Sequence, residues 1–371
     1  MMRVWCGMAL ALGLGAWDPV CAGSAEPWQG PYLGSEATGA TVLAYWSFEP
    51  GVGGTDLSGR GHALAPRGSS RFGDGGAIGA GCLECFATGE DKGAGGGAVA
   101  KHHPALSPEG AFTIEMWIKA KPEIEANKSA WLLDKKYIDY HKEGADADRD
   151  YCLKLVQAAG GKRRLVAQLG FGDDSADFGS GGFELPTGAW THLAFAYDGS
   201  GAGRFFVNGR DLGGSTHPGR GGVSGGKRDL VVGDRIGSNY AAFPGWIDGV
   251  RILSRAEVFR TGRLELDRGV GRWAFRRMEA GASLSARVCN QTGAPLSDCV
   301  ATLELDGMGA ARGIAVGDMG LDEDRQIAFP VDTSLRADRY RGRIVVEGRA
   351  GETAHRSEMP VELVLAARPV P

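Results

Sequence analysis

Two polar segments of the chain bring carboxylates close to aromatic side chains. Residues 172–182 form an acidic loop bounded by glycines, and residues 137–150 form a second charged segment that begins with a tyrosine. Carboxylates accept hydrogen bonds from hydroxyl groups, and aromatic rings pack against the apolar faces of sugar rings. We therefore expect a ligand site in these loops. Its candidate residues are Tyr137, Asp173, Asp174 and Asp177 from these segments, together with Tyr240 from a later part of the chain.

The second segment also resembles the start of a calcium-binding loop. Asp146, Asp148 and Asp150 occupy alternate positions, as in the first half of an EF-hand. Tyr151 stands where that loop needs glycine, and Gln157 stands where it needs glutamate. The pattern favours a solvated acidic loop over a calcium site.

These loops must connect β-strands, and the sequence of residues 188–209 predicts two such strands. Residues 190–197 are mostly apolar on both alternating faces, which is typical of a strand that is covered on each side. Residues 198–201 predict a turn into a second strand at 204–207. Asn208 and Gly209 then end that strand with a strong hairpin signal, so a further hairpin should follow at once.

Five blocks of sequence, in their order along the chain, resemble the laminin-G-like, concanavalin A-like jelly roll. The resemblance covers residues 41–262 and implies an all-β fold of two packed sheets. The blocks that carry it are residues 44–49 (AYWSFE) with 56–61 (DLSGRG), 112–118 (FTIEMWI), 190–209, 230–233 (LVVG) and 245–255 (GWIDGVRILSR).

The resemblance also implies a structural calcium ion near the entry and exit of the chain. Hard cations prefer clustered carboxylates and carbonyl oxygens. The matching positions are Asp56 and Asp248, with Glu49 as a further candidate. The alternative is that Asp56 caps its own turn by accepting backbone N–H groups.

The same fold hosts glycoside hydrolases, which need two carboxyl groups beside the scissile bond. In laminarinase-type enzymes the pair lies on one strand as Glu-x-Asp-x-x-Glu, and this spacing is absent here. Glu265 and Asp267 come nearest but lie beyond the matched region, and Glu115 stands alone on its strand. His192 matches a structural, hydrogen-bonded histidine of the family. We predict a non-catalytic protein, with a carboxyl pair assembled from distant loops as the open alternative.

Composition and the N-terminal residues point to an exported protein. The net charge of −4 does not favour nucleic acid as a partner, and 61 glycines spread between apolar runs are typical of turns in a β protein. Residues 1–25 resemble a signal peptide, with Arg3 before an apolar run too short to span a bilayer. Residues 26–40 are expected to be a loosely held lead-in. We expect a secreted, periplasmic or cell-surface location without a membrane span.

The last hundred residues have a different pattern. Residues 270–371 resemble an immunoglobulin-like or fibronectin-III-like β-sandwich in the spacing of strands and turns. Cys289 and Cys299 flank a turn between two of these strands, and export favours a disulfide between them. The pairing of Cys82, Cys85 and Cys152 cannot be deduced from the sequence.

These observations predict an exported binding protein, and carbohydrate is the leading ligand class. A module that contacts an extracellular protein is the first alternative. An accessory part or a member of a polysaccharide-degrading system is the second. The choice among them rests on the fold family and not on a recognised site.

Overall fold

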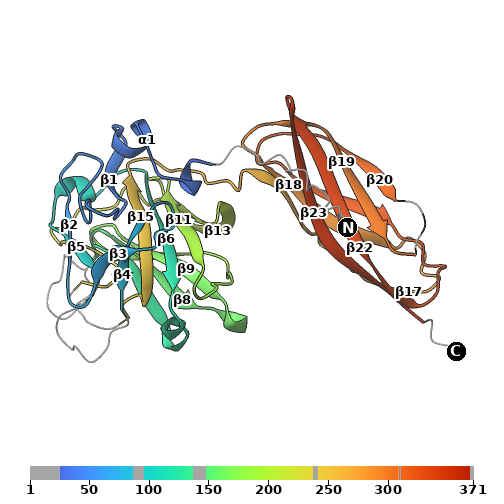
Figure 1. Cartoon of the computed structure of the whole chain (residues 1–371), viewed down its shortest axis with the longest axis horizontal. Helices are drawn as coiled ribbons and strands as arrows, with labels where there is room; N and C mark the ends of the chain where they lie inside the picture. Colours follow the sequence, from blue (N-terminus) through green and yellow to red (C-terminus); the bar gives the residue numbers. More distant parts are fainter. Residues whose placement is uncertain are drawn as a thin grey trace, which may run out of the picture. The chain divides into compact units, whose positions relative to one another are not determined.

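The computed structural model describes residues 26–86, 96–136, 148–236, 241–307, 309 and 311–367. The chain forms two compact units, Ala25–Gly262 and Arg263–Pro371, which we call the larger and the smaller unit. Both are built mainly of β-strands, as Figure 1 shows. No helix in the described part of the chain is long and apolar enough to cross a membrane.

The larger unit contains two antiparallel sheets (Figure 1). The eight-stranded sheet runs β13-β12-β11-β6-β15-β4-β3, with β1 paired to β15. Its strands are β1 (Val42–Trp46), β3 (Arg71–Asp74), β4 (Gly81–Cys85), β6 (Phe112–Ala120), β11 (Trp190–Tyr197), β12 (Ala202–Val207), β13 (Arg210–Thr216) and β15 (Gly245–Leu253). The seven-stranded sheet contains, in spatial order, β10 (Ser175–Gly179), β9 (Arg163–Gly170), β8 (Tyr151–Gln157), β7 (Ser129–Asp134), β14 (Leu230–Val232), β5 (Ala98–Ala100) and β2 (Leu64–Pro66).

The hydrophobic core lies between these sheets, and strand β6 shows how the sequence builds it. Alternate residues of β6 point to opposite faces, so Phe112, Ile114, Met116 and Ile118 are fully buried in the core. Removing each large apolar side chain from water contributes about 1.5–3 kcal/mol. The other face of β6 carries Glu115 and further polar or aromatic residues. The all-β, jelly-roll-like arrangement confirms the predicted fold class of this unit.

The lead-in segment packs on the outer face of the eight-stranded sheet. It contains the 3-10 helix η1 (Pro27–Gln29) and the short helix α1 (Ser35–Thr38). Trp28 and Tyr32 are each only 5% exposed and belong to a second apolar cluster with residues of β1, β11 and β15. The expectation of a loosely held lead-in is therefore wrong, because its aromatic side chains are buried against the sheet. Further helical turns among the described residues of this unit are η2 (Pro104–Leu106), η3 (Pro122–Ala126) and η5 (Ala159–Gly161).

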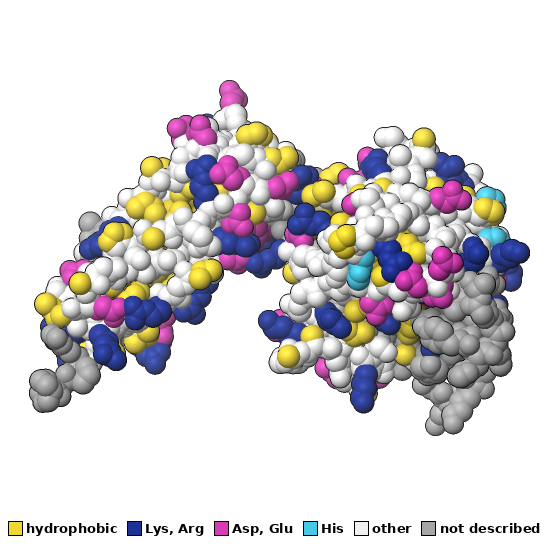
Figure 2. Space-filling view, turned by 180° about the vertical axis from the view of Figure 1, so that it is seen from behind, with side chains coloured by type: hydrophobic (Ala, Val, Ile, Leu, Met, Phe, Trp, Pro, Cys, Tyr) yellow, Lys and Arg dark blue, Asp and Glu magenta, His cyan; other side chains and the backbone are white. Residues whose placement is uncertain are grey.

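The smaller unit is also built from two sheets around one core. One sheet contains β16 (Arg263–Arg268), β18 (Ser283–Gln291) and β21 (Asp324–Pro330). The other has the order β17 (Ala274–Arg276), β23 (Thr353–Ala366), β22 (Asp338–Ala350), β19 (Leu296–Leu305) and β20 (Arg312–Met319). Buried residues of both sheets form one apolar cluster. On the face seen in Figure 2, basic and acidic side chains of this unit are interspersed.

The structure corrects the predicted disulfide. Cys289 and Cys299 are both free thiols. Their strands, β18 and β19, follow one another in the chain but belong to opposite sheets, so they do not form the expected hairpin. Cys299 faces the core and is 1% exposed, whereas Cys289 is half-buried and its sulfur accepts a weak contact from the Gln291 side chain. Cys82, Cys85 and Cys152 are likewise free and buried.

Candidate ligand-binding surface

A row of aromatic and charged side chains crosses the outer face of the eight-stranded sheet. Trp190 of β11 and Trp246 of β15 both lie opposite Lys119 of β6. Glu84 of β4 lies opposite Trp246, and Arg71 of β3 lies opposite Glu84. Residues in register on one face are neighbours even when they are distant in sequence. Five strands therefore contribute to one continuous row.

Basic groups alternate with aromatic rings along this row. The Lys119 Nζ atom lies 4.9 Å from the ring centre of Trp190 and 4.7 Å from that of Trp246. The Lys121 Nζ atom lies 4.6 Å from the ring centre of Trp246 and 3.9 Å from that of Phe86. Each ammonium group is within the range of a cation–π interaction with two rings. We define the aromatic–cation row by its members Trp190, Lys119, Trp246, Lys121, Phe86, Arg71 and Glu84.

One carboxylate joins the basic groups at the end of the row. Glu84 accepts hydrogen bonds from Lys121 at 2.8 Å and forms an ion pair with Arg71 at 2.6 Å. Burial raises the pKa of Glu84, but hydrogen bonding and charge from Lys121 and Arg71 outweigh it, so the net pKa lies below its ordinary value. Glu84 is therefore ionised at neutral pH. The Arg71 side chain is 66% exposed, while those of Lys121 and Glu84 are 13% and 14% exposed.

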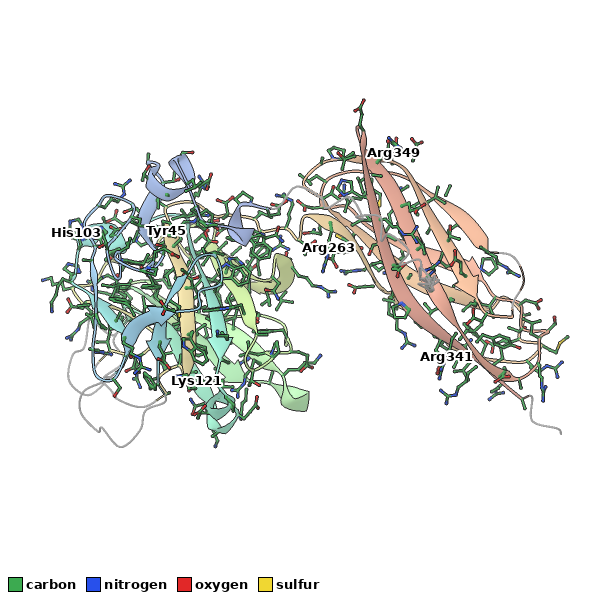
Figure 3. All side chains as sticks on the ribbon, viewed as in Figure 1. Tyr45, His103, Lys121, Arg263, Arg341 and Arg349 are labelled. Atoms are coloured by element: carbon green, nitrogen blue, oxygen red, sulfur yellow. The ribbon has the colours of Figure 1, made fainter. Side chains whose placement is uncertain are left out.

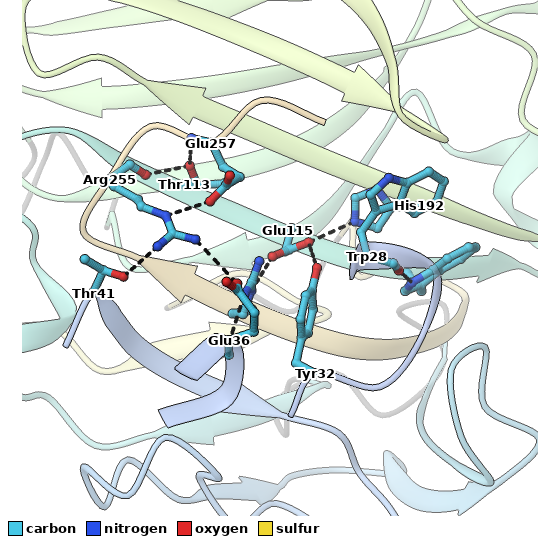
Figure 4. Close-up of polar contacts among 11 residues, drawn as sticks. Trp28, Tyr32, Glu36, Thr41, Thr113, Glu115, His192, Arg255 and Glu257 are labelled. Carbon is cyan, nitrogen blue, oxygen red and sulfur yellow. Dashed lines mark hydrogen bonds and ion pairs between the residues drawn. The ribbon is translucent and has the colours of Figure 1, made fainter. Parts of the chain in front are cut away.

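The lead-in covers the other end of the same sheet face, where polar groups are buried (Figure 4). Glu115 accepts hydrogen bonds from the Arg251 guanidinium and from the Tyr32 hydroxyl, the latter at 2.6 Å, and its carboxylate lies 3.1 Å from His192 Nε2. Glu115, His192 and Arg251 are at most 2% exposed. In Figure 3, Tyr45 lies towards the end of the sheet near the lead-in, and Lys121 lies towards the opposite end.

The electrostatics of this buried network favour an ionised glutamate and a neutral histidine. Burial raises the pKa of Glu115, but the His192 hydrogen bond and the Arg251 charge lower it by more. The pKa of Glu115 therefore lies below its ordinary value. Burial lowers the pKa of His192 despite the opposing effect of Glu115. The ring of His192 also packs on Trp28, with ring centres 4.6 Å apart. His192 is buried and hydrogen-bonded, as predicted, and its structural role stays a prediction.

The residues predicted to bind calcium lie at two separate places, Asp56 in a turn after β1 and Asp248 within β15. The Asp56 carboxylate accepts backbone N–H groups of Tyr45, Ser58 and His62 at 2.9–3.1 Å, which is the capping alternative. Asp248 and Glu49 instead face residues 77–80, where their oxygens accept backbone N–H groups. Burial, with a smaller contribution from Glu49, raises the pKa of Asp248 to about 6.

In both places the carboxylate oxygens are engaged by backbone groups. The oxygens that would bind the ion already accept N–H donors, which point positive ends at the carboxylates. Within the described ranges, no group of three or more His, Cys, Asp or Glu side chains could hold a metal ion. Structural calcium stays a prediction.

Replacing Asp248 with alanine is expected to lower the free energy of unfolding by about 2–3 kcal/mol, because the buried N–H groups of Ala77, Ile78 and Gly249 lose their acceptor. Thermal unfolding of both proteins with calcium and with chelator checks the cause. A loss that is equal in the two conditions supports the anchoring role. A calcium-dependent rise in melting temperature that the substitution abolishes would establish the metal site instead.

The structure places the predicted acidic loop residues in one hairpin. Asp173 and Asp174 lie in the turn between β9 and β10, and Asp177 is exposed on β10. Asp174 forms a two-fold ion pair with Arg220, one contact being 2.7 Å, and Arg220 lies over the ring of Phe171. Tyr137 and Tyr240 lie outside the described residues. The hairpin therefore stays a predicted ligand site, for which the structure describes only the three aspartates.

The segment that resembles an EF-hand differs from the solvated loop expected from the sequence. Asp150 is 1% exposed and forms an ion pair with Lys135 at 2.9 Å, and Lys135 is itself fully buried. Asp148 accepts a hydrogen bond from Ser175. The expectation of solvation is wrong for Asp150, because Lys135, the residue after β7, neutralises it inside the fold. Asp146 lies outside the described residues.

Comparisons with known proteins agree with this fold. Residues 92–257 match the model of the concanavalin A-like lectin/glucanases superfamily. That stretch includes β6, β11 and β15, the three strands that carry Lys119, Trp190 and Trp246. The match confirms the resemblance for this part of the chain. No curated protein matches the sequence.

Several solved structures are similar at low identity. Domain 4 of an extracellular arabinanase from Geobacillus stearothermophilus, in complex with arabinotriose, is 20% identical, with a TM-score of 0.40 over 58% of this chain and 93% of its own. The binding domain of botulinum neurotoxin DC, in complex with rat synaptotagmin II, is 10% identical, with a TM-score of 0.45 over 87% and 94%. A pentraxin from Limulus polyphemus is 16% identical, with a TM-score of 0.30 over 40% and 65%. None of the three identifies a ligand for this chain.

Proposed function

We propose that this chain is an exported, non-catalytic protein that binds carbohydrate through the aromatic–cation row. One observation carries the proposal: Trp190 and Trp246 stand in one row, partly exposed, on a sheet face that also presents amines and a carboxylate. Indole rings pack on the apolar faces of sugars, and the charged groups can exchange hydrogen bonds with hydroxyls. The superfamily match over the same strands supports this class of ligand.

The dimensions of the row favour an oligosaccharide or a polymer over a single sugar. Neighbouring strands lie about 4.8 Å apart. Trp190 and Trp246 flank β6 from either side, so their backbones are separated by roughly 10 Å. A ligand that contacts both rings therefore needs at least two sugar units. Short strips of surface aromatics of this kind also occur in protein-contact modules, which stay the alternative.

The smaller unit contributes no member of the aromatic–cation row. We propose that it is an immunoglobulin-like sandwich, since a three-stranded and a five-stranded sheet enclose its core. The short pairing of β17 with β23 is parallel. The other strand pairs in the described part of this unit are antiparallel.

Binding of the full chain to a panel of immobilised polysaccharides tests the proposal. We expect Trp190→Ala and Trp246→Ala each to weaken binding of the recognised glycan about tenfold, the loss of roughly 1.4 kcal/mol that a buried aromatic contact supplies. Trp273→Ala is the matched control, because that indole lies under Arg268 in the smaller unit, with 4.5 Å between the Arg268 Cζ atom and the ring centre.

Three outcomes would contradict the proposal. Binding that survives both tryptophan substitutions but is lost in Asp174→Ala would place the site in the acidic hairpin. Equal losses in all three tryptophan variants would indicate a general effect on folding. Absence of binding to every glycan would favour a protein-contact module.

A further inference from the structure

We infer that the aromatic–cation row selects a polysaccharide that carries carboxylate or sulfate groups, an inference that rests on the proposed function. The net charge of the chain is −4, which does not favour an anionic partner overall. The row differs from the chain as a whole, because its members include three basic side chains, Lys119, Lys121 and Arg71, and one carboxylate, Glu84, which pairs with Lys121 and Arg71. Three positive charges and one negative charge leave a local charge of +2.

Lys119 is the basic group most available to a ligand. Among the described residues its ammonium group contacts only the rings of Trp190 and Trp246 and forms no ion pair. Lys121 and Arg71, in contrast, are both engaged by Glu84. An ammonium group held between two rings without a counter-ion is partly desolvated, and this strengthens its interaction with an anion. An anionic substituent on a sugar chain that lies along the row would complete this site.

The spacing of the row suits a polymer whose rings and charges alternate. Aromatic rings and cations follow one another as Trp190, Lys119, Trp246, Lys121 and Phe86, with Arg71 against Phe86 at 5.4 Å. Rings that contact sugar faces are thereby separated by groups that attract anions. A neutral glycan would use the rings and leave the cation between them unpaired. Because of this charge complementarity, we expect the row to bind an anionic glycan more tightly than a neutral one.

Two matched pairs of polysaccharides test the inference with the full chain. Dextran sulfate is compared with dextran, and polygalacturonate with its methyl ester, so that the sulfate and carboxylate sources are distinguished. We expect at least one charged member to bind tenfold or more tightly than its uncharged partner at 50 mM NaCl. Raising the salt to 500 mM should weaken that binding several-fold, because added salt screens exposed charges.

Substitutions of opposite sign separate ligand contact from folding. Lys119→Met keeps the length of the side chain and removes the charge, and we expect binding to weaken about three- to tenfold. Glu84→Gln frees Lys121 and Arg71, and we expect binding to strengthen two- to threefold. Lys154→Met is the matched control, because Lys154 lies over Trp131 with 5.1 Å between its Nζ atom and the ring centre, on the seven-stranded sheet.

The outcomes distinguish this inference from the proposed function. Equal binding of charged and neutral members, lost on Trp190→Ala, would keep carbohydrate binding and overturn the anionic preference. Equal weakening by Lys119→Met and Lys154→Met would indicate diffuse attraction and would also overturn it. A gain of affinity in Glu84→Gln would support it, since a merely structural role predicts a loss. Failure of every polysaccharide to bind would overturn both.

Discussion

Replacing Arg251 with methionine is expected to lower the free energy of unfolding of the larger unit by about 3–5 kcal/mol at pH 7. The guanidinium is 2% exposed, hydrogen bonds to Glu115, and pairs with Glu36 at 2.9 Å. It also lies over the ring of Tyr32, with the Cζ atom 3.6 Å from the ring centre. Methionine fills a similar volume, but it leaves the carboxylate of Glu115 buried without its charged partner.

The pH dependence of this loss identifies its cause. Burial raises the pKa of Glu115, and the His192 hydrogen bond together with the Arg251 charge currently holds it below the ordinary value. Without Arg251 the pKa rises in the folded state, so the folded variant takes up a proton more readily than the wild-type protein. The destabilisation should therefore be largest at pH 7 and should shrink towards pH 4, where Glu115 becomes neutral. Urea denaturation of both full chains across this range measures the difference.

A surface ion pair provides the matched control. Arg343 of β22 pairs with Glu304 at 2.7 Å, and the two side chains are 48% and 42% exposed. Arg343→Met should change the free energy of unfolding far less, because water screens the pair and solvates the remaining carboxylate. A cost for Arg251→Met as small as this control, or one that does not change with pH, would show that Glu115 is not the reason for the loss.

The strands and the core of the larger unit were predictable because their signals are local. The apolar run at residues 190–197 became β11, and its turn led to β12 and β13 as two successive hairpins. Asn208 and Gly209 adopt φ values of 49° and 76°, as the hairpin signal required. In strand β6, likewise, the alternation of large apolar residues with other residues shows which side chains enter the core. Such patterns need no knowledge of distant partners.

The candidate surface was not predictable, since it depends on strand order. Trp190, Lys119 and Trp246 are far apart in sequence, and only the placement of β6 between β11 and β15 makes them neighbours. The same reason explains the incorrect disulfide: Cys289 and Cys299 are close in sequence but belong to strands of opposite sheets. Asp150 was expected to be solvated because nothing local reveals that Lys135 neutralises it. A signal was available for the lead-in, where Trp28 and Tyr32 interrupt an otherwise polar segment.

Trp28→Ala is expected to destabilise the larger unit by about 3–5 kcal/mol, the usual cost of removing a large buried aromatic side chain. Trp28 stacks on His192 and lies 5.6 Å from Trp117 between ring centres. Its indole N–H donates to the Arg260 carbonyl at 2.8 Å. The substitution would open a cavity above the buried network and admit water. Thermal and urea unfolding measure the loss.

Two further measurements show whether the lead-in acts as a cover. Burial lowers the pKa of His192, so admission of water should return this pKa towards its ordinary value, which histidine titration by NMR detects. Trp190→Ala is the matched substitution, because Trp190 lies on the same sheet face but is partly exposed and contacts Lys119. Trp190→Ala should lower the free energy of unfolding by about 1 kcal/mol and leave the pKa of His192 unchanged.

If Trp28→Ala costs no more than Trp190→Ala and leaves the His192 pKa unaltered, the lead-in does not seal the network. If the costs differ as expected, residues 26–40 are part of the fold. The row that begins where this cover ends is then the sheet face left available to a ligand.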